Sequence, residues 1–344
     1  MVKRINLALQ GGGAHGAFTW GVLDRLLDED DIEVAAMSGT SAGALNGAAF
    51  KAGMLDGGRT GARENLDWLW TKVGSLDDMR LATWLEWPGM SVGAISRAIE
   101  YSLPYSVVDG VSRMMSPYAY GPFYQNPLRP IVEEITMDRI QSTSGPCLFV
   151  CATNVRNGKV KVFKNAEISV EAIMASACLP TLFQAVEIEE PKTGETEAYW
   201  DGGYTGNPAL FPLYEKQYPD DVVIVNINPL ERDKVPFTPQ EIQNRINEIS
   251  FNSSLLRELR AVNFVKRLLA DGDLDPASFK DVKVHMIADD ALMNDLSVAT
   301  KLIPQPYVIA KLKEAGQVAC DRFLSEHKAQ IGEKGSVDLV EMFS

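Results

Sequence analysis

The stretch INLALQGGGAHGAFTWGVLDRLLDEDDIEVAAMSGTSAGALNGAAFKAG, residues 5–53, decides the fold. Residues 5–9 form a short apolar run that meets three glycines, which is typical of a buried parallel strand. A helix follows from 14 to about 27, and a second strand at 32–37 leads into a helix that ends near Gly53. Strand, helix, strand and helix in this order imply parallel strands with right-handed crossovers, so we expect an α/β fold.

The composition favours a single globular domain. The chain has 344 residues, of which 46% are hydrophobic, and its formal net charge is −13. This apolar content supplies a large core, and no linker-like or low-complexity stretch divides the chain, so we expect one domain over residues 1–344. The negative charge repels phosphate backbones, which excludes nucleic acid as a partner. The sequence does not indicate an oligomeric state.

Regular alternation of strands and helices resumes after residue 128. The pattern predicts strands at 147–153, 159–163, 222–227 and 282–287, a hairpin at 186–200, and helices at 128–137, 169–178 and 306–327. Residues 81–125 differ, because they are rich in aromatic residues and methionine but are broken by prolines. We expect them to form a cover of short helices and loops. This cover either packs on the core or acts as a lid or acyl-chain channel.

The segment 238–344 is predicted to be a helical C-terminal extension. Its first helix begins at Thr238 in the sequence TPQE, which combines a capping box with proline at the first helical position. Three isoleucines of this helix recur at helical spacing, and we expect Ile242, Ile246 and Ile249 to point into the core.

Cysteine usage and the absence of an apolar leader indicate the compartment. The four cysteines lack metal-ligand spacing and three lie in apolar surroundings, which is typical of free thiols in a reducing environment. No secretory leader opens the sequence, and no uncharged run approaches the ~20 residues that span a bilayer. We therefore expect a cytoplasmic protein with peripheral contact to membranes. No calcium-loop motif occurs, so we expect no metal and no cofactor.

The glycines of the first turn admit several interpretations. Gly11, Gly13 and Gly16 spell G-x-G-x-x-G between a strand and a helix, where backbone N–H groups can bind an anion. A dinucleotide fold needs an acidic residue at the end of the second strand, but residues 37–39 are Met-Ser-Gly. A nucleotide phosphate loop needs Gly-Lys-Ser/Thr, but this loop has Ala-His-Gly. The oxyanion of an ester under attack is the third candidate.

The second strand ends in a more specific motif, GTSAG at 39–43. G-x-S-x-G between a strand and a helix is typical of a nucleophile elbow, in which Ser41 stands clear of a sharp turn. The alternative is that Thr40 or Ser41 merely caps the following helix. The strand, the helix and the nearby glycine loop together favour the elbow.

A serine nucleophile needs a base, and two arrangements compete. The first is a triad of Ser41, Asp201 and His285, whose chain order matches that of α/β-hydrolases. Against it, the elbow follows only the second strand, and His285 lies inside a predicted strand. The second pairs Ser41 directly with Asp201 of YWDGGYTGNPAL, residues 199–210. Burial would then have to raise the aspartate pKa from its ordinary ~3.9.

Four motifs in a fixed order are more specific than any one of them. G-G-G-x-x-G at 11–16 is followed by G-x-S-x-G at 39–43, A-S-x-x-x-P at 175–180 and Asp-Gly-Gly at 201–203. Over about residues 5–210, this order resembles the patatin-like phospholipase family.

The resemblance implies a three-layer α/β/α fold with a mainly parallel central sheet and an enzyme that cleaves fatty-acyl esters of lipids. By motif, Ser41 would be the nucleophile and Asp201 the base, with no catalytic histidine. The N–H groups of Gly11, Gly12 and Gly13 would form the oxyanion hole. The partner would be a lipid ester, such as a phospholipid or lysophospholipid, at a membrane or lipid-particle surface.

One position departs from the family pattern, because this chain has His15 where the glycine loop usually carries arginine. The backbone donors remain, but a fixed positive charge is removed. Three alternatives stay open beside the dyad hydrolase: a catalytically weak lipid-binding or regulatory module, a transacylase, and a Ser-His-Asp esterase.

Overall fold

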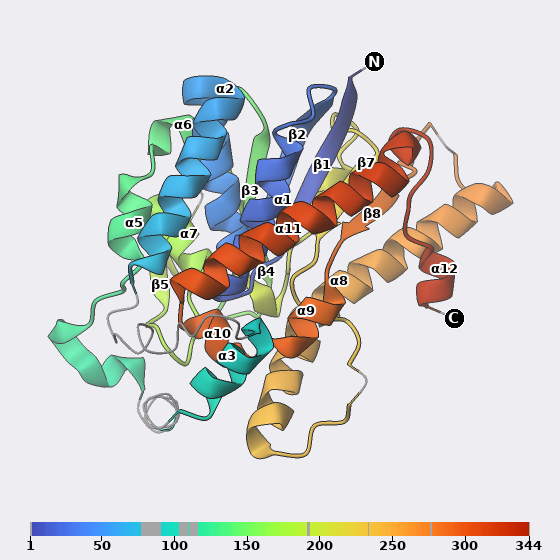
Figure 1. Cartoon of the computed structure of the whole chain (residues 1–344). Helices are drawn as coiled ribbons and strands as arrows, with labels where there is room; N and C mark the ends of the chain where they lie inside the picture. Colours follow the sequence, from blue (N-terminus) through green and yellow to red (C-terminus); the bar gives the residue numbers. More distant parts are fainter. Residues whose placement is uncertain are drawn as a thin grey trace.

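The computed structural model describes residues 2–76, 91–102, 110, 116–190, 193–232, 234–275 and 277–343. Within these residues, an eight-stranded sheet lies at the centre of the molecule (Figure 1). The strands are β1 (Lys3–Leu9), β2 (Ile32–Thr40), β3 (Cys147–Asn154), β4 (Val160–Lys164), β5 (Val186–Glu189), β6 (Thr196–Asp201), β7 (Asp221–Val225) and β8 (Lys283–Ile287). Their order is β5-β6-β3-β2-β1-β7-β8, and β4 also pairs with β3.

The sheet is mainly parallel. β1 pairs in parallel with β2 and β7, β2 with β3, and β7 with β8. These five strands therefore run parallel to one another, as expected from the sequence. The antiparallel pairs β3–β4, β3–β6 and β5–β6 lie toward one edge. The α/β fold class expected from the sequence is confirmed.

Helices cover both faces of the sheet (Figure 1). The longer helices are α1 (Ala17–Leu26), α2 (Ala42–Gly74), α3 (Val92–Glu100), α8 (Pro239–Asp271) and α11 (Pro306–His327). The shorter α-helices are α5 (Arg129–Glu134), α6 (Met137–Gln141), α7 (Val170–Ser176), α9 (Asp290–Asp295), α10 (Val298–Leu302) and α12 (Leu339–Met342). The 3-10 turns are η1 (Gly13–Gly16), η2 (Pro117–Phe123), η3 (Asn165–Glu167), η4 (Gly202–Tyr204), η5 (Phe211–Tyr214) and η6 (Lys328–Gln330).

Alternate side chains of each strand pack on opposite faces, as the two-residue period of a strand requires. Leu7 and Leu9 of β1 belong to a core shared with α1, α2 and α11. Ala8 of the same strand belongs to a second core, shared with β7 and with Leu255 and Leu259 of α8. The sheet is therefore the middle layer of three.

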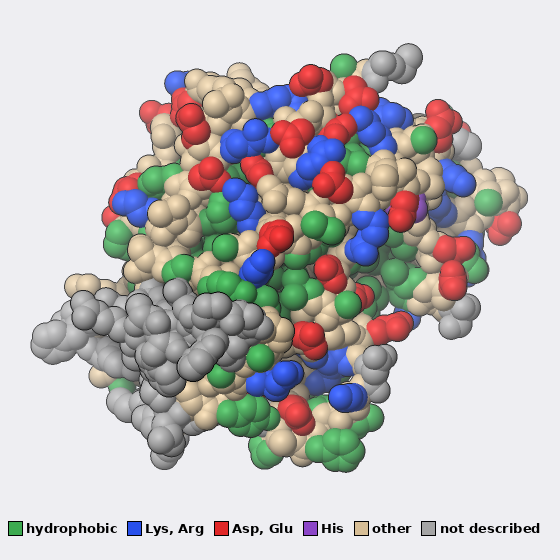
Figure 2. Space-filling model, viewed as in Figure 1, with side chains coloured by type: hydrophobic (Ala, Val, Ile, Leu, Met, Phe, Trp, Pro, Cys, Tyr) green, Lys and Arg blue, Asp and Glu red, His purple; other side chains and the backbone are tan. Residues whose placement is uncertain are grey.

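The inward face of α8 is not the one that we expected. Ile242, Ile246 and Ile249 are 42%, 54% and 54% exposed, so their predicted core role is wrong. The buried stripe of this helix instead contains Asn252 and Leu255. Helical spacing correctly predicted that the three isoleucines share one face of the helix, but this face does not meet the core. The opposite face is buried although it contains polar side chains, because these side chains form hydrogen bonds there. Figure 2 shows hydrophobic side chains gathered at the lower edge of the molecule, near the start of α8.

Most other elements match their predicted ranges, but the helix predicted at 128–137 is the shorter α5, and α6 follows it. The helix expected to end near Gly53 continues to Gly74 as α2, with a kink at Gly57 and Gly58. Much of 81–125 lies outside the described residues, so its role as a lid or channel stays a prediction. The segment 238–344 contributes β8 to the sheet and helices to both outer layers. Within the part of the chain that is described, no helix has the length and apolar character needed to cross a bilayer.

We expect Gly43→Ala to lower the free energy of unfolding by more than about 3 kcal/mol, or to prevent folding. A Cβ at Gly43 would lie 2.1 Å from the carbonyl oxygen of Leu9, and this backbone cannot shift without disturbing the sheet. Gly74→Ala in the same helix is the control, because its Cβ would meet only the Ile309 side chain at 3.5 Å and the Pro306 side chain at 4.0 Å. Urea unfolding measures both variants. A Gly43→Ala protein as stable as the parent would contradict this packing.

Candidate active site

Ser41 occupies a strained turn between β2 and α2. Its backbone has φ 53° and ψ −120°, a conformation that side-chain-bearing residues rarely adopt. The flanking glycines make the turn possible, since a Cβ on Gly39 would lie 2.5 Å from the carbonyl oxygen of Gly43. This is the geometry of a nucleophile elbow, in which the serine Oγ projects away from the backbone.

Ser176 of the A-S-x-x-x-P motif holds the backbone of this turn. The Ser41 N–H donates to Ser176 Oγ at 2.9 Å, and the Ser176 hydroxyl donates to the Cys151 carbonyl oxygen at 2.6 Å. Ser176 is fully buried. It therefore fixes the elbow to β3, a role that the motif alone did not predict.

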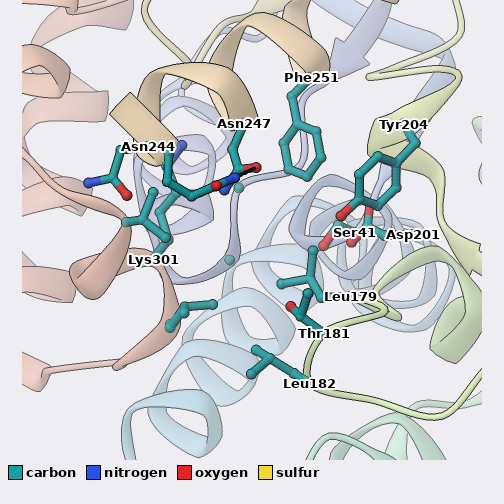
Figure 3. Close-up of a pocket in the computed structure, with 15 residues that line it drawn as sticks. Ser41, Leu179, Thr181, Leu182, Asp201, Tyr204, Asn244, Asn247, Phe251 and Lys301 are labelled. Atoms are coloured by element: carbon teal, nitrogen blue, oxygen red, sulfur yellow. Dashed lines mark hydrogen bonds between the residues drawn. The ribbon is translucent and has the colours of Figure 1, made fainter. Parts of the chain in front are cut away.

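Strand β3 brings Asp201 beside Ser41. On one side of β3, Thr40 of β2 lies opposite Cys151. On the same side, Asp201 of β6 lies opposite the next residue, Ala152, because β4 pairs along the other side of β3. The residue that ends β6 and the residue that follows β2 thus meet at consecutive positions of β3, and Figure 3 shows the Ser41 and Asp201 side chains next to each other.

The Asp201 carboxylate is buried and accepts hydrogen bonds. Its Oδ1 accepts from the Gly203 N–H at 2.7 Å, and the Ser41 hydroxyl donates to the same carboxylate. Burial raises the pKa of Asp201 to about 7, although both hydrogen bonds oppose this effect. A carboxylate with this pKa is a much stronger base than an ordinary aspartate and is still partly ionised at neutral pH.

The glycine loop at the end of β1 lies against the elbow. Gly12 and Gly13 line the same cavity as Ser41, and their N–H groups have no hydrogen-bond acceptor among the described residues. Gly11 differs, because its N–H donates to Asn207 Oδ1 at 2.7 Å. Two of the three predicted oxyanion-hole residues therefore lie at the cavity, while Gly11 anchors the loop.

Buried amides hold this loop from behind. Gln10 Oε1 accepts from the N–H groups of Ile227 and Asn228 at 2.9 and 3.1 Å. Asn228 Nδ2 donates to the Gly11 carbonyl oxygen at 2.8 Å, and Gln10 Nε2 donates to Asn252 Oδ1 at 3.2 Å. No sequence motif predicted these residues. Their one local signal is that Gln10 directly precedes the glycines.

His285 lies away from Ser41. Its Nε2 is 2.9 Å from Asp221 Oδ1 and its Nδ1 is 3.2 Å from Ser336 Oγ. Asp221 begins β7, whereas Ser41 follows the end of β2, and these strands run parallel within the sheet. The Asp221–His285 pair therefore lies toward the opposite end of the parallel strands from Ser41. The alternative triad of Ser41, Asp201 and His285 is not formed.

His15 is buried beneath the glycine loop, where it contacts α10. The Thr300 hydroxyl donates to the Ser297 carbonyl oxygen at 2.8 Å and lies 2.8 Å from His15 Nε2, so it accepts from that nitrogen. Burial lowers the pKa of His15 well below its ordinary value, and the positive charges of Lys301 and Arg232 lower it further. The imidazole is therefore neutral at pH 7 and does not replace an arginine charge.

Ser41 and Asp201 open into a cavity of about 360 Å³ (Figure 3). Its walls come from the glycine loop, the segment after α7, and helices α8 and α10. Tyr204 and Phe251 form part of the wall, with their rings edge to face at 5.2 Å. Its aliphatic lining consists of Leu179, Leu182, Val298 and Leu302. Such a concave, largely apolar site with a few polar groups is suited to a small amphiphilic ligand.

These features define an α/β protein with a nucleophile-elbow site beside a buried carboxylate. Among the residues that the structure describes, no group of three or more His, Cys, Asp or Glu side chains is placed to hold a metal ion.

Comparisons with known proteins assign the chain to a family. The model of the patatin-like phospholipase family matches residues 7–214, and the chain belongs to this family. No curated protein matches it. Lipid acyl hydrolysis is the activity of the family, which supports an esterase or phospholipase function.

Solved structures that are similar to the chain include two bacterial proteins of low sequence identity. VipD from Legionella pneumophila is 14% identical with a TM-score of 0.43, and the match covers 94% of this chain and 67% of that chain. ExoU from Pseudomonas aeruginosa, solved in complex with SpcU, is 13% identical with a TM-score of 0.32. That match covers 93% of this chain and 53% of ExoU.

We expect Ser176→Ala to reduce the reaction of Ser41 with a fluorophosphonate at least about tenfold, because the turn loses its hydrogen-bonded support. Ser169→Ala is the matched control. Ser169 caps the other end of α7 by accepting from the Ala172 N–H, so its loss costs about 1 kcal/mol of stability without touching the elbow. Labelling rates and urea unfolding are measured together. Equal labelling rates for the two variants would contradict the bracing role of Ser176.

Proposed function

We propose that the protein is a serine acyl hydrolase that cleaves fatty-acyl ester bonds of lipids through a Ser41–Asp201 dyad. The observation that carries this proposal is the hydrogen bond between Ser41, in its strained turn, and a buried carboxylate whose pKa is about 7. Membership of the patatin-like phospholipase family supports a lipid ester as the substrate.

In the first step, Asp201 takes the proton of the Ser41 hydroxyl as Oγ attacks the acyl carbonyl carbon. The carbonyl oxygen becomes an oxyanion, which accepts hydrogen bonds from the N–H groups of Gly12 and Gly13. Asp201 then gives its proton to the departing alcohol oxygen, and an acyl ester of Ser41 remains.

Water completes the reaction. Asp201 accepts a proton from a water molecule as its oxygen attacks the acyl-serine carbonyl, and the same oxyanion donors act again. Collapse of this second intermediate breaks the bond to Ser41 Oγ, which recovers its proton from Asp201. The products are a fatty acid and the free enzyme.

We place the protein in the cytoplasm, where it meets its substrate at a membrane or lipid-particle surface. All four cysteines are free and three of them are buried, as expected in a reducing compartment. The lipid substrate itself resides in an assembly, so peripheral contact is required.

We expect Ser41→Ala and Asp201→Asn each to lower kcat for p-nitrophenyl butyrate by at least about 1,000-fold, because one removes the nucleophile and the other removes the base. His285→Gln is the control, since His285 pairs with Asp221 away from the site. It is expected to lose stability and to keep its activity when folded. A folded His285→Gln protein without activity would contradict the dyad.

A fluorophosphonate distinguishes an enzyme from a silent lipid-binding module. The parent is expected to label at Ser41, and Ser41→Ala is expected not to label. An unlabelled parent would favour the binding module. Product analysis with an added acceptor alcohol then separates hydrolysis from transacylation, because only a transacylase forms the new ester as its main product.

The pH dependence of kcat/KM tests the base. Because Asp201 must be ionised to accept the serine proton, kcat/KM for p-nitrophenyl butyrate should be constant well above pH 7. It should fall about tenfold per pH unit below about 7, the pKa of the buried carboxyl. The parent's thermal melting across the same pH range controls for unfolding. An acid limb near pH 4 in folded protein would contradict Asp201 as the base.

A further inference from the structure

The cavity beside Ser41 has a polar end away from the elbow. In Figure 3, Lys301, Asn244 and Asn247 lie on one side of the cavity. Ser41 and Asp201 lie on the other side. A ligand that reaches the elbow with one end can therefore meet these polar side chains with another.

Lys301 brings a positive charge to this end. Its Nζ donates to Asn228 Oδ1 at 2.8 Å, and it forms no ion pair with any described residue. Burial lowers the pKa of Lys301 to about 8, so the ammonium is still mostly protonated at pH 7. A desolvated cation without a carboxylate partner is costly, and an anionic ligand would offset that cost.

Glu248 neutralises this charge only in part: its carboxylate raises the pKa of Lys301, but it is hydrogen-bonded elsewhere. The Glu248 carboxylate accepts from Arg232 Nε at 2.8 Å and from Arg245 at 3.3 Å, so two guanidinium groups share it. Glu100 is the other acid near Arg232, and burial raises the pKa of its carboxyl, which favours the neutral form. Together with Lys301, these arginines and glutamates form a cluster with an excess of positive charge.

Asn247 adds a hydrogen-bond donor beside Lys301. Its Oδ1 accepts from Gln243 Nε2 at 3.3 Å, while its Nδ2 has no acceptor among the residues that the structure describes. Lys301 and Asn247 both line the cavity. An ammonium and an amide N–H match the oxygens of a phosphate group, which accept charge-assisted hydrogen bonds.

We propose that Lys301 and Asn247 bind the anionic phosphate of the substrate while its acyl ester lies at Ser41. The protein would then prefer acyl esters of glycerophosphate lipids to neutral glycerides. This inference rests on the proposed function, since it takes the reacting ester to lie at the elbow. It assigns the selectivity to residues beyond 214, where the family model ends.

A binding experiment tests the phosphate site without turnover. Octyl phosphate is titrated into the parent, Lys301→Gln, Lys301→Arg and Lys334→Gln by calorimetry. Lys301→Gln is expected to weaken binding at least about tenfold, which is about 1.4 kcal/mol, and Lys301→Arg to restore part of it. Lys334 is exposed and lies outside the cavity, so Lys334→Gln should bind like the parent.

Two further titrations separate phosphate recognition from general packing and from binding of free phosphate. Octyl glucoside is a neutral amphiphile, and an equal loss of its binding in Lys301→Gln would overturn the proposal, because the effect would then be general packing. Inorganic phosphate bound as tightly as octyl phosphate would also overturn it, since the site would then recognise free phosphate rather than a lipid. Thermal melting confirms that each variant is folded.

A turnover experiment separates this inference from the proposed function. The ratio of kcat/KM for 1-octanoyl-lysophosphatidate over that for 1-octanoylglycerol is expected to exceed one in the parent and to fall at least about tenfold in Lys301→Gln. If both esters are hydrolysed and the ratio does not change, the phosphate site is wrong and the hydrolase stands. If octyl phosphate binds through Lys301 but neither ester is hydrolysed, the site stands and the proposed reaction fails.

Discussion

The structure depends on the close approach of two turns at the ends of adjacent parallel strands. A Cβ on Gly43 would lie 2.1 Å from the Leu9 carbonyl oxygen, and one on Gly11 would lie 2.8 Å from the Ser41 Cβ. No side chain fits between these backbones, so the glycines are a steric requirement rather than a source of flexibility. Because β1 and β2 are neighbours, the glycine loop and the elbow meet wherever the sheet forms. The position of the Ser41 hydroxyl relative to the glycine-loop N–H groups is thereby set by strand pairing.

The remaining parts of the site are positioned by contacts that reach far along the chain. β2 and β6 pair with consecutive residues on the same edge of β3, and this places Asp201 beside Ser41, although the two residues are far apart in the sequence. The glycine loop lacks regular pairing of its own, so Gln10 and Asn228 satisfy its backbone and that of the β7 end. Buried amides are stabilising only when their partners are present, which makes this network a rigid support. Such rigidity suits the proposed reaction, because oxyanion donors are effective only when preorganised.

The sequence predicted what local patterns determine. Ser41 and Asp201 were predicted as site residues because each belongs to a short glycine-containing motif, and these motifs follow a recognisable order. The structure brings the two residues together. The role of Gly11 could not be predicted, because its N–H is taken by Asn207, which is 196 positions away. The hydrophobic spacing also could not predict which face of α8 is buried. Its buried stripe contains Asn252, whose amide donates to the Pro229 carbonyl oxygen at 3.0 Å, so a polar residue outcompetes isoleucine for the interior.

Asp201 and Lys301 lie on opposite sides of the cavity. Their separation allows the carboxylate to keep a raised pKa while the lysine keeps its charge. A cation within about 4–6 Å of a carboxylate lowers its pKa by roughly 1–3 units, which would return Asp201 to a feeble base. The influences on the Asp201 pKa are burial and two hydrogen bonds from neutral donors, with no contribution from a cation. The substitution of His15 for the usual arginine fits this constraint, because the neutral imidazole adds no charge near the elbow. Under the two proposals, a lysine that binds substrate phosphate can coexist with an uncompensated aspartate base only where it lies beyond the reach of that carboxylate. Lys301 meets this condition, because it lies across the cavity from Asp201 and does not contribute to the Asp201 pKa.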